Sequence, residues 1–205
     1  MPLNRSGVRL GFSVLRHSSL LLLVLVFATG DIVPDLILGT IFSSPVGVAV
    51  DPNSNDLYVS DAGHSRVLRF GNRNQLTNSS GLSTVFGQRD FTQLSLNAGM
   101  GGVNPEGLHA PWGIVVDNNG SLWVADYLNN RVLQWQDAAT DKSGMNASTV
   151  LGQSTFYLAD SNATITSASQ PTGIRFYASD LWVVDSNNNR FISSVSTNTT
   201  TFNTN

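Results

Sequence analysis

The chain has 205 residues, which is enough for one domain with a sizeable core or for part of a larger repeat array. Only 12% of its residues are charged, with eleven Lys and Arg against fourteen Asp and Glu, and it has no cysteine. This composition excludes disulfide bonds and thiolate chemistry. It also lacks the basic surface that a nucleic-acid backbone requires, so no nucleic-acid partner is expected.

The first 30 residues have the layout of a secretory signal. Residues 1–19 contain three arginines and no acidic residue, and residues 20–28 form an apolar run. The small residues Ala28 and Gly30 at the end of this run suit signal peptidase. We expect cleavage after Gly30, because the apolar run is nine residues long and a membrane-spanning helix needs about 20. The alternative is an uncleaved anchor, the one case in which we expect membrane contact. Cleavage would leave eight basic and fourteen acidic residues, a net charge of −6, on a secreted chain.

Three segments of the chain repeat one pattern. Residues 45–70 read PVGVAVDPNSNDLYVSDAGHSRVLRF, residues 111–135 read PWGIVVDNNGSLWVADYLNNRVLQW, and residues 171–194 read PTGIRFYASDLWVVDSNNNRFISS. They share P-x-G-[VI], an apolar alternation, a polar turn, and then L-[YW]-V-x-D-x-x-[HN]-x-R-[VF]. A second element, V-[FL]-G-Q-x-x-F, occurs at residues 85–91 and 150–156. Such internal repetition predicts a repeat architecture.

Each copy predicts three short β-strands joined by turns. In the second copy the first turn contains Asn119-Gly120, a pair that tolerates the positive φ of a tight two-residue hairpin. With residues 85–86 or 150–151 as a fourth strand, each period becomes a four-stranded antiparallel meander, the unit of a β-propeller blade. We therefore predict an all-β chain with about three blades over residues 36–195, followed by a low-complexity polar tail over residues 196–205.

Each copy also holds an aspartate and an arginine five residues apart, on either side of the turn between its second and third strands. An aspartate can accept backbone N–H groups there and an arginine can reach back to it, which predicts a turn clamp. The presence of the pair in every copy favours a structural role over a catalytic one. The pairs are Asp61 and Arg66, Asp126 and Arg131, and Asp185 and Arg190.

The motif D-x-x-[HN]-x-R-V after an aromatic-Val strand, preceded by P-x-G-[VI]-x-V-D, resembles the NHL repeat. The third copy departs from the motif at Phe176-Tyr177 and at Phe191. The resemblance implies a β-propeller that serves mostly as a rigid interaction platform. Some members bind proteins, some bind RNA through a basic face, and a related amidating lyase is a zinc enzyme. Closed propellers have 4–8 blades, so we expect an open or incomplete ring that is part of a longer propeller. The alternative is self-association through open blade edges.

Little in the sequence supports catalysis, and no cofactor, metal site or catalytic residue is predicted. After signal removal only two histidines remain, His64 and His109, too few for a zinc site without cysteine. His64 takes the place of an asparagine in the other copies and is assigned to the turn. His109 lies where the blade-entry loops gather near the propeller axis, and Trp112 follows Pro111 at a loop-proximal place. We predict His109 and Trp112 as binding residues.

The sequence predicts a secreted or cell-surface NHL-repeat scaffold that binds a protein or a glycan without catalysis. Its binding loops are expected over residues 88–110 and 153–170, because long loops on a rigid scaffold carry most binding residues. The alternative is a fragment of a secreted propeller enzyme of the metal-dependent lyase or hydrolase type. Most N-x-[ST] sequons fall in predicted loops and are candidate glycosylation sites: Asn78, Asn119, Asn146, Asn162 and Asn198.

Overall fold

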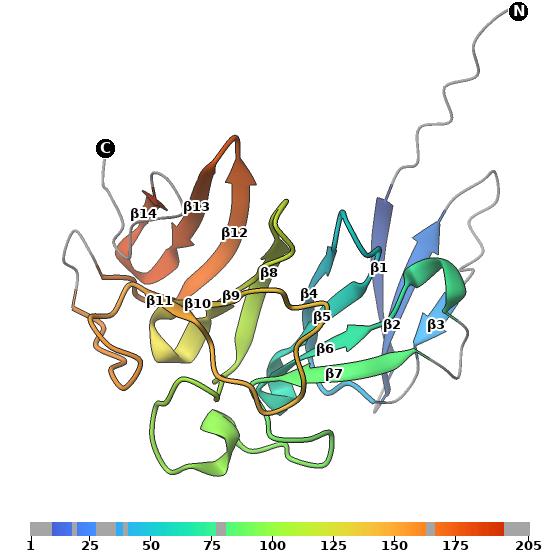
Figure 1. Cartoon of the computed structure of the whole chain (residues 1–205), viewed down its shortest axis with the longest axis horizontal. Coiled ribbons are helices and arrows are strands. Elements are labelled where there is room, and N and C mark those ends of the chain that lie inside the picture. Colours follow the sequence, from blue (N-terminus) through green and yellow to red (C-terminus); the bar gives the residue numbers. More distant parts are fainter. Residues whose placement is uncertain are drawn as a thin grey trace, which may run out of the picture.

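The structure is a computed structural model that describes residues 10–17, 20–27, 36–38, 41–76, 81–162 and 167–194 (Figure 1). These residues form four antiparallel sheets joined by loops and short 3₁₀ turns. An N-terminal sheet contains β1 (Leu10–His17), β2 (Leu20–Phe27) and β3 (Leu36–Leu38). The other three sheets coincide with the three sequence repeats, and we call them blade one, blade two and blade three in chain order.

Blades one and two are four-stranded meanders in which each strand pairs with the next along the chain. Blade one contains β4 (Pro45–Val50), β5 (Leu57–Asp61), β6 (Arg66–Phe70) and β7 (Leu82–Phe86). Blade two contains β8 (Pro111–Val116), β9 (Leu122–Asp126), β10 (Arg131–Trp135) and β11 (Thr149–Leu151). Blade three contains β12 (Pro171–Tyr177), β13 (Asp180–Asp185) and β14 (Arg190–Ser194), with no fourth strand among the described residues.

The prediction of an all-β chain with propeller-type blades is therefore confirmed. The fourth strands fall where the second sequence element placed them, at β7 and β11. The described 3₁₀ turns are Ala62–His64, Arg73–Gln75, Leu96–Gly99, Tyr127–Asn129 and Ser186–Asn188. Three of them join the second and third strands of a blade, at the turn that the aspartate and arginine of each repeat enclose.

The hairpin between β8 and β9 differs from the predicted two-residue turn. Residues 117–121 separate the two strands, and within them only Gly120 has a positive φ, of 81°. Oδ1 of Asp117 accepts hydrogen bonds from the backbone N of Asn119 at 2.8 Å and of Ser121 at 2.9 Å. The predicted hairpin is confirmed, but its turn is longer than two residues, because the aspartate side chain satisfies the N–H groups of a longer turn.

The N-terminal sheet lies outside the three repeats. β1 and β2 pair along their whole length as a hairpin, and β3 pairs with β2. The predicted signal segment overlaps this hairpin. Its cleavage is a processing step that the fold does not test, and it stays a prediction. The predicted tail over residues 196–205 lies outside the described residues. In the part of the chain that the structure describes, no helix is long and apolar enough to cross a membrane.

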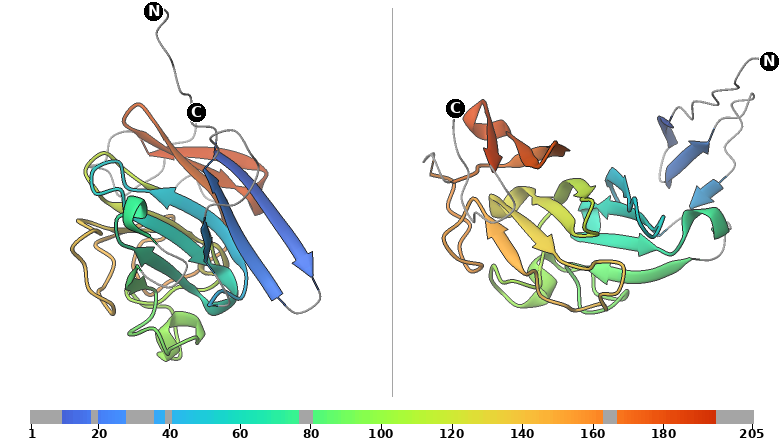
Figure 2. Two further views of the ribbon diagram at one scale, coloured as in Figure 1. Left: turned by 90° about the vertical axis from the view of Figure 1, so that its right-hand side faces the viewer. Right: turned by 45° about the horizontal axis from the view of Figure 1, so that its top comes forward.

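The blades follow one another in an arc, with the N-terminal sheet beyond blade one and blade three at the other end (Figures 1 and 2). The first strands of the blades, β4, β8 and β12, are in contact. A Cβ atom on Gly47 would lie 2.5 Å from the carbonyl oxygen of Trp112, and one on Gly113 would clash with the carbonyl oxygen of Thr172. The glycine of P-x-G is therefore needed where consecutive first strands approach each other.

The apolar cores lie between the blades, and the L-[YW]-V pattern explains them. In β9, Leu122 and Val124 pack toward blade one, whereas Trp123 packs toward blade three. In β5, Tyr58 packs toward blade two in the same way. Because successive side chains of a strand point to opposite faces, β9 turns its aliphatic side chains to blade one and its tryptophan to blade three.

Candidate functional site

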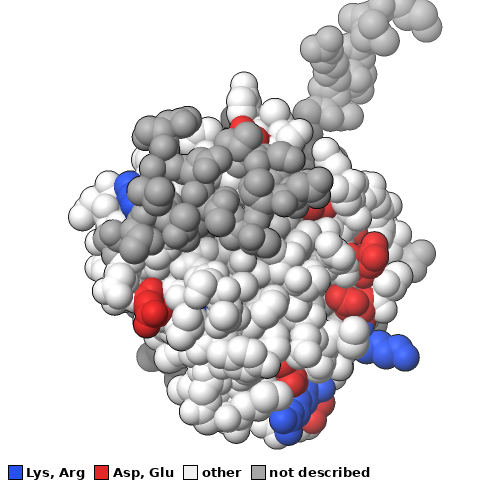
Figure 3. Space-filling model, turned by 60° about the vertical axis from the view of Figure 1, so that its left-hand side comes forward, with Lys and Arg blue, Asp and Glu red and all other residues white. Residues whose placement is uncertain are grey.

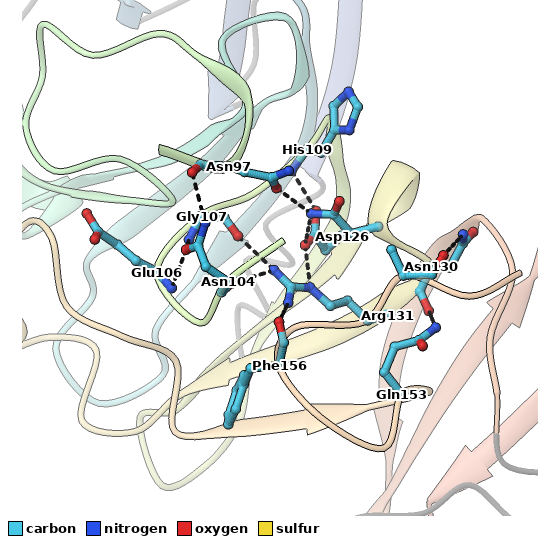
Figure 4. A network of polar contacts seen from close by, with 12 residues as sticks. Asn97, Asn104, Glu106, Gly107, His109, Asp126, Asn130, Arg131, Gln153 and Phe156 are labelled. Carbon is cyan, nitrogen blue, oxygen red and sulfur yellow. Dashed lines mark hydrogen bonds and ion pairs between the residues drawn. The ribbon is translucent and has the colours of Figure 1, made fainter. Parts of the chain in front are cut away.

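The aspartate and arginine of blade two meet in a buried polar network (Figure 4). Oδ2 of Asp126 accepts hydrogen bonds from Nε of Arg131 at 2.7 Å and from Nδ2 of Asn129 at 2.8 Å. Its Oδ1 accepts one from the backbone N of His109 at 2.7 Å. Both charged side chains are fully buried. The aspartate thus links the turn after β9 to the loop that enters β8.

The arginine extends this network to two long loops. Arg131 donates to the carbonyl oxygen of Phe156 at 2.6 Å, and to those of Asn104 and Gly107 at 2.9 Å each. In blade one, Arg66 donates to the carbonyl oxygens of Phe91 at 3.1 Å and Ile41 at 2.7 Å. The repeated G-Q-x-x-F element therefore supplies a backbone acceptor for the clamp arginine. We did not anticipate this from the sequence.

The glutamine of the same element holds the adjoining loops. Gln88 Nε2 donates to the carbonyl oxygens of His64, Ser65 and Ser95 at 2.8–3.1 Å. In the next period, Gln153 Nε2 donates to two carbonyl oxygens at 2.8 Å each, one of them from the turn after β9. The preceding glycines, Gly87 and Gly152, both have φ of 84°, a conformation that favours glycine.

The clamps of the other blades have the same geometry. Nε of Arg66 lies 3.1 Å from Oδ2 of Asp61. Oδ1 of Asp61 accepts hydrogen bonds from the two backbone N–H groups that precede β4. Asp185 and Arg190 lie 2.7 Å apart, with 25% of the Arg190 side chain exposed. Each pair is committed to protein partners, so the structure places all six predicted clamp residues in contacts that hold turns and loops.

The sequence-predicted binding residues His109 and Trp112 lie on the two sides of Pro111, at the entrance to β8. The backbone of His109 is bound by the clamp, whereas its imidazole points away from that network (Figure 4). Trp112 is 40% exposed and stacks on Tyr127, with ring centroids 5.0 Å apart and an interplanar angle of 26°. Among the contacts of the described residues, none joins the His109 imidazole to Trp112.

Tyr127 is a candidate binding residue that the sequence reasoning missed. It directly follows the clamp residue Asp126, where the other copies have Ala62 and Ser186. Its hydroxyl donates to Oε1 of Gln170 at 3.2 Å, in the loop that enters β12. The aromatic residue at a position that is small in the other repeats was the signal that could have revealed it.

The residue between the proline and the glycine of P-x-G is the second residue of each first strand, β4, β8 and β12. Val46 and Trp112 are exposed, and Thr172 is half-buried beside Ser186. Because the first strands contact one another, these side chains share one end of the blade array. We define the axial surface by the following residues, which differ in type but share this end: Val46, Trp112, Tyr127, Gln170 and Thr172.

Glu106 is buried in the loop before β8, and its Oε1 has no hydrogen-bond partner in the described residues. Burial raises the pKa of the Glu106 carboxyl, and the guanidinium of Arg89, with Nε 3.8 Å from Oε1, partly offsets this rise. Figure 4 shows the Glu106 side chain pointing away from the clamp. Among the described residues, no three His, Asp or Glu side chains are grouped so that they could hold a metal ion.

Three of the five predicted glycosylation residues lie in the part of the chain that the structure describes. Asn119, Asn146 and Asn162 are exposed, each in a loop or turn. Asn78 and Asn198 lie outside the described residues. An exposed loop leaves room for a glycan, but glycosylation itself stays a prediction.

The NHL repeat model matches the chain at residues 42–70 and 108–135. Similar solved structures include virginiamycin B lyase from Staphylococcus aureus, with a TM-score of 0.46 and 19% identity over 76% of this chain and 39% of that chain. A luciferin-regenerating enzyme has a TM-score of 0.45 and 16% identity over 72% and 39%. The calcium-binding protein regucalcin from Agrobacterium tumefaciens has a TM-score of 0.43 and 19% identity over 80% and 43%. The chain spans less than half the length of each. No curated protein sequence matches it.

Proposed function

We propose that this chain, which contains NHL repeats folded as β-propeller blades, is a non-catalytic binding scaffold of the cell exterior. Its ligand would be a protein, or a glycan carried by one, held at the axial surface. The observation that carries this proposal is the exposed Trp112 stacked on Tyr127. A large exposed aromatic side chain that is already fixed in orientation loses little conformational entropy when a ligand covers it.

The surroundings of the aromatic pair support the same proposal. Ser60 Oγ donates to the carbonyl oxygen of Trp112 at 2.6 Å, which ties its backbone to the buried strand β5. Tyr127 is held through its hydroxyl by Gln170. The pair is thus positioned by the scaffold, and the amide of Gln170 and the hydroxyl of Thr172 lie nearby to orient a polar ligand. Positioned aromatic anchors with a few polar neighbours are typical of binding surfaces.

The binding proposal can be tested with the substitution Trp112→Ala. We expect binding to immobilised extracellular proteins and glycans to fall by about tenfold or more, because the substitution removes the anchor side chain. The melting temperature should fall only modestly, because the chain stays folded when the partly exposed side chain and its stacking contact with Tyr127 are removed. Surface plasmon resonance and thermal melting are the measurements.

The matched control is Met145→Ala, which removes an apolar side chain that is 49% exposed in the loop between β10 and β11, outside the axial surface and the predicted binding loops. It should leave binding unchanged. Equal binding by the wild type and Trp112→Ala would reject the axial surface as the ligand site. So would an equal loss in the control variant.

The extracellular part of the proposal rests on the signal-like first 30 residues and the exposed sequons. Expression in a secreting eukaryotic cell should yield a chain that begins at Asp31 and has a heterogeneous mass. Glycosidase treatment should collapse that mass, and Asn146→Gln should remove one glycan. Asn53→Gln, at an exposed asparagine outside any sequon, is the control. An unmodified chain that begins at Met1 would contradict this part alone.

A further inference from the structure

The axial surface lies among segments that contain no charged residue. Each blade contributes two of them, the entry segment before its first strand and the turn after its second strand. In every blade a backbone hydrogen bond of 2.9–3.2 Å joins the two segments, from Ala62 to Ser44, from Leu128 to His109 and from Asn187 to Ser169. None of the residues in these segments is Lys, Arg, Asp or Glu. The segments are residues 41–44, 62–65, 107–110, 127–130, 167–170 and 186–189.

The charged groups that adjoin these segments are the clamp pairs. The three clamp aspartates are fully buried, and each lies within 3.1 Å of its arginine. Nδ1 of His64 is 2.7 Å from Asp61 and belongs to the same clamp. On the side of the molecule drawn in Figure 3, acidic and basic residues form small separate groups in a mostly uncharged surface, where it is not grey. The segments around the axial surface thus offer a charged ligand no unpaired carboxylate or guanidinium, and they favour an uncharged ligand.

Trp112 presents a flat aromatic face at this uncharged surface. Tyr127 stacks on one face of the indole, so the exposed 40% of Trp112 lies on its other face and its edges. Both residues belong to blade two, which has a described blade on each side. Their exposure is therefore not that of a blade at the end of the array. The face of an aromatic ring carries partial negative charge, and it attracts the weakly positive C–H groups of a flat ligand.

The polar groups beside the aromatic pair can both donate and accept hydrogen bonds. The Tyr127 hydroxyl donates to Oε1 of Gln170, and in the described residues Nε2 of Gln170 donates to no partner. Oγ1 of Thr172 and Oγ of Ser186 lie 2.5 Å apart and share one hydrogen, so the other hydroxyl hydrogen remains to be donated. The backbone of Thr172 lies against β8 just beyond Trp112. Donors and acceptors are thus mixed next to the aromatic face.

We propose that the axial surface binds a neutral saccharide whose ring stacks on Trp112. A pyranose ring has a face made largely of C–H groups, which suits the indole, and each of its hydroxyls both donates and accepts. The amide of Gln170 and the hydroxyls of Thr172 and Ser186 can pair with such hydroxyls in either direction. This inference rests on the proposed function, since it names the ligand of the same surface.

Calorimetric titration of the full chain with neutral oligosaccharides of glucose, mannose, galactose and N-acetylglucosamine tests the inference. We expect at least one of them to bind the wild type. Trp112→Phe, which keeps an aromatic face, should bind it within about threefold of the wild type. Trp112→Leu, which keeps only apolar volume, should bind about tenfold more weakly, because stacking contributes up to roughly that factor beyond area burial. Met145→Ala is the control and should bind like the wild type, and melting curves should show that each variant is folded.

The salt dependence provides a readout that needs no variant. The affinity for the oligosaccharide should be unchanged between about 50 mM and about 500 mM salt, because screening acts on charged ligands and not on a neutral one. An affinity that falls steeply with salt would overturn the proposal, since it would show that charge carries the binding.

The remaining outcomes separate the saccharide from the binding surface itself. If Trp112→Ala loses binding to an extracellular glycoprotein, and the wild type still binds that protein after enzymatic removal of its glycans, the ligand is a protein. The proposed function then stands and the saccharide inference fails. If no oligosaccharide binds, or if Trp112→Leu binds one as tightly as the wild type, the inference also fails. If neither oligosaccharides nor glycoproteins bind in a way that depends on Trp112, the proposed function fails with it.

Discussion

Asp126 accepts from three residues and Arg131 donates to four, and both side chains are fully buried. Removing two charges from water costs several kcal/mol per ion, and hydrogen bonds must offset this cost. Here the bonds join a turn, the loop that enters β8 and the loop that leaves β11. At the scale of single residues, the clamp therefore connects parts of the chain that strand pairing does not.

The clamp can be tested with Asp126→Ala, which leaves the Arg131 charge buried without its carboxylate. We expect a loss of about 3–5 kcal/mol in the free energy of unfolding, because an uncompensated buried charge is strongly destabilising. Chemical denaturation followed by tryptophan fluorescence measures it. Asp90→Ala is the control, since Asp90 is exposed and its carboxylate accepts hydrogen bonds from Thr92 and Gln93 in its own loop.

Asp90→Ala should cost less than about 1 kcal/mol, as most exposed substitutions do. If Asp126→Ala unfolded like the wild type but no longer bound the ligand of the axial surface, the carboxylate would have a role in recognition instead. The structural reading of all three clamps would then be wrong.

At the scale of the element, contacts between the first strands of consecutive blades hold the blades together. β4 lies against β8, and β8 lies against β12. Ser60 adds a hydrogen bond from β5 to the carbonyl oxygen of Trp112 on β8. This approach depends on the glycine of P-x-G, because any side chain at that position meets the backbone of the next blade. The motif glycine is thus a packing requirement rather than a turn signal.

The packing requirement predicts the outcome of Gly113→Ala. The new Cβ atom would meet the carbonyl oxygen of Thr172, a backbone atom that cannot swing aside. We expect a loss of about 1–3 kcal/mol, as for other overpacked positions, measured by denaturant unfolding. Gly102→Ala is the matched control, because its Cβ would have no heavy atom within 4 Å. Similar stability of the two variants would show that β8 and β12 can separate without cost.

At the scale of the whole molecule, the chain is an array in which each blade contacts its immediate neighbours. In such arrays stability is close to a sum over the repeats and their interfaces. Trp182 and Phe191 are exposed on blade three, on a face that no blade covers among the described residues.

Much of the fold followed from the repeats, whereas the candidate site followed only in part. Trp112 could be singled out because it interrupts the repeat pattern next to Pro111. Tyr127 also interrupts the pattern, but its contact with Trp112 joins the 3₁₀ turn after β9 to β8 and depends on how the turn and the strand are placed in the fold. The hydrogen bond from Arg131 to the carbonyl oxygen of Phe156 could not be predicted. Every residue has a backbone carbonyl, so the residue type does not show which one accepts a hydrogen bond.

The three repeats, the strands within each blade and the aspartate and arginine of each clamp could be predicted from the sequence, because they depend on local periodicity and turn chemistry. Which aromatic residues are covered could not be predicted in this way. Tyr58, Trp123 and Trp182 occupy one position of the same motif, yet only Trp182 is exposed. The physical reason is that burial depends on the neighbouring blade, and among the described residues blade three has none on that side.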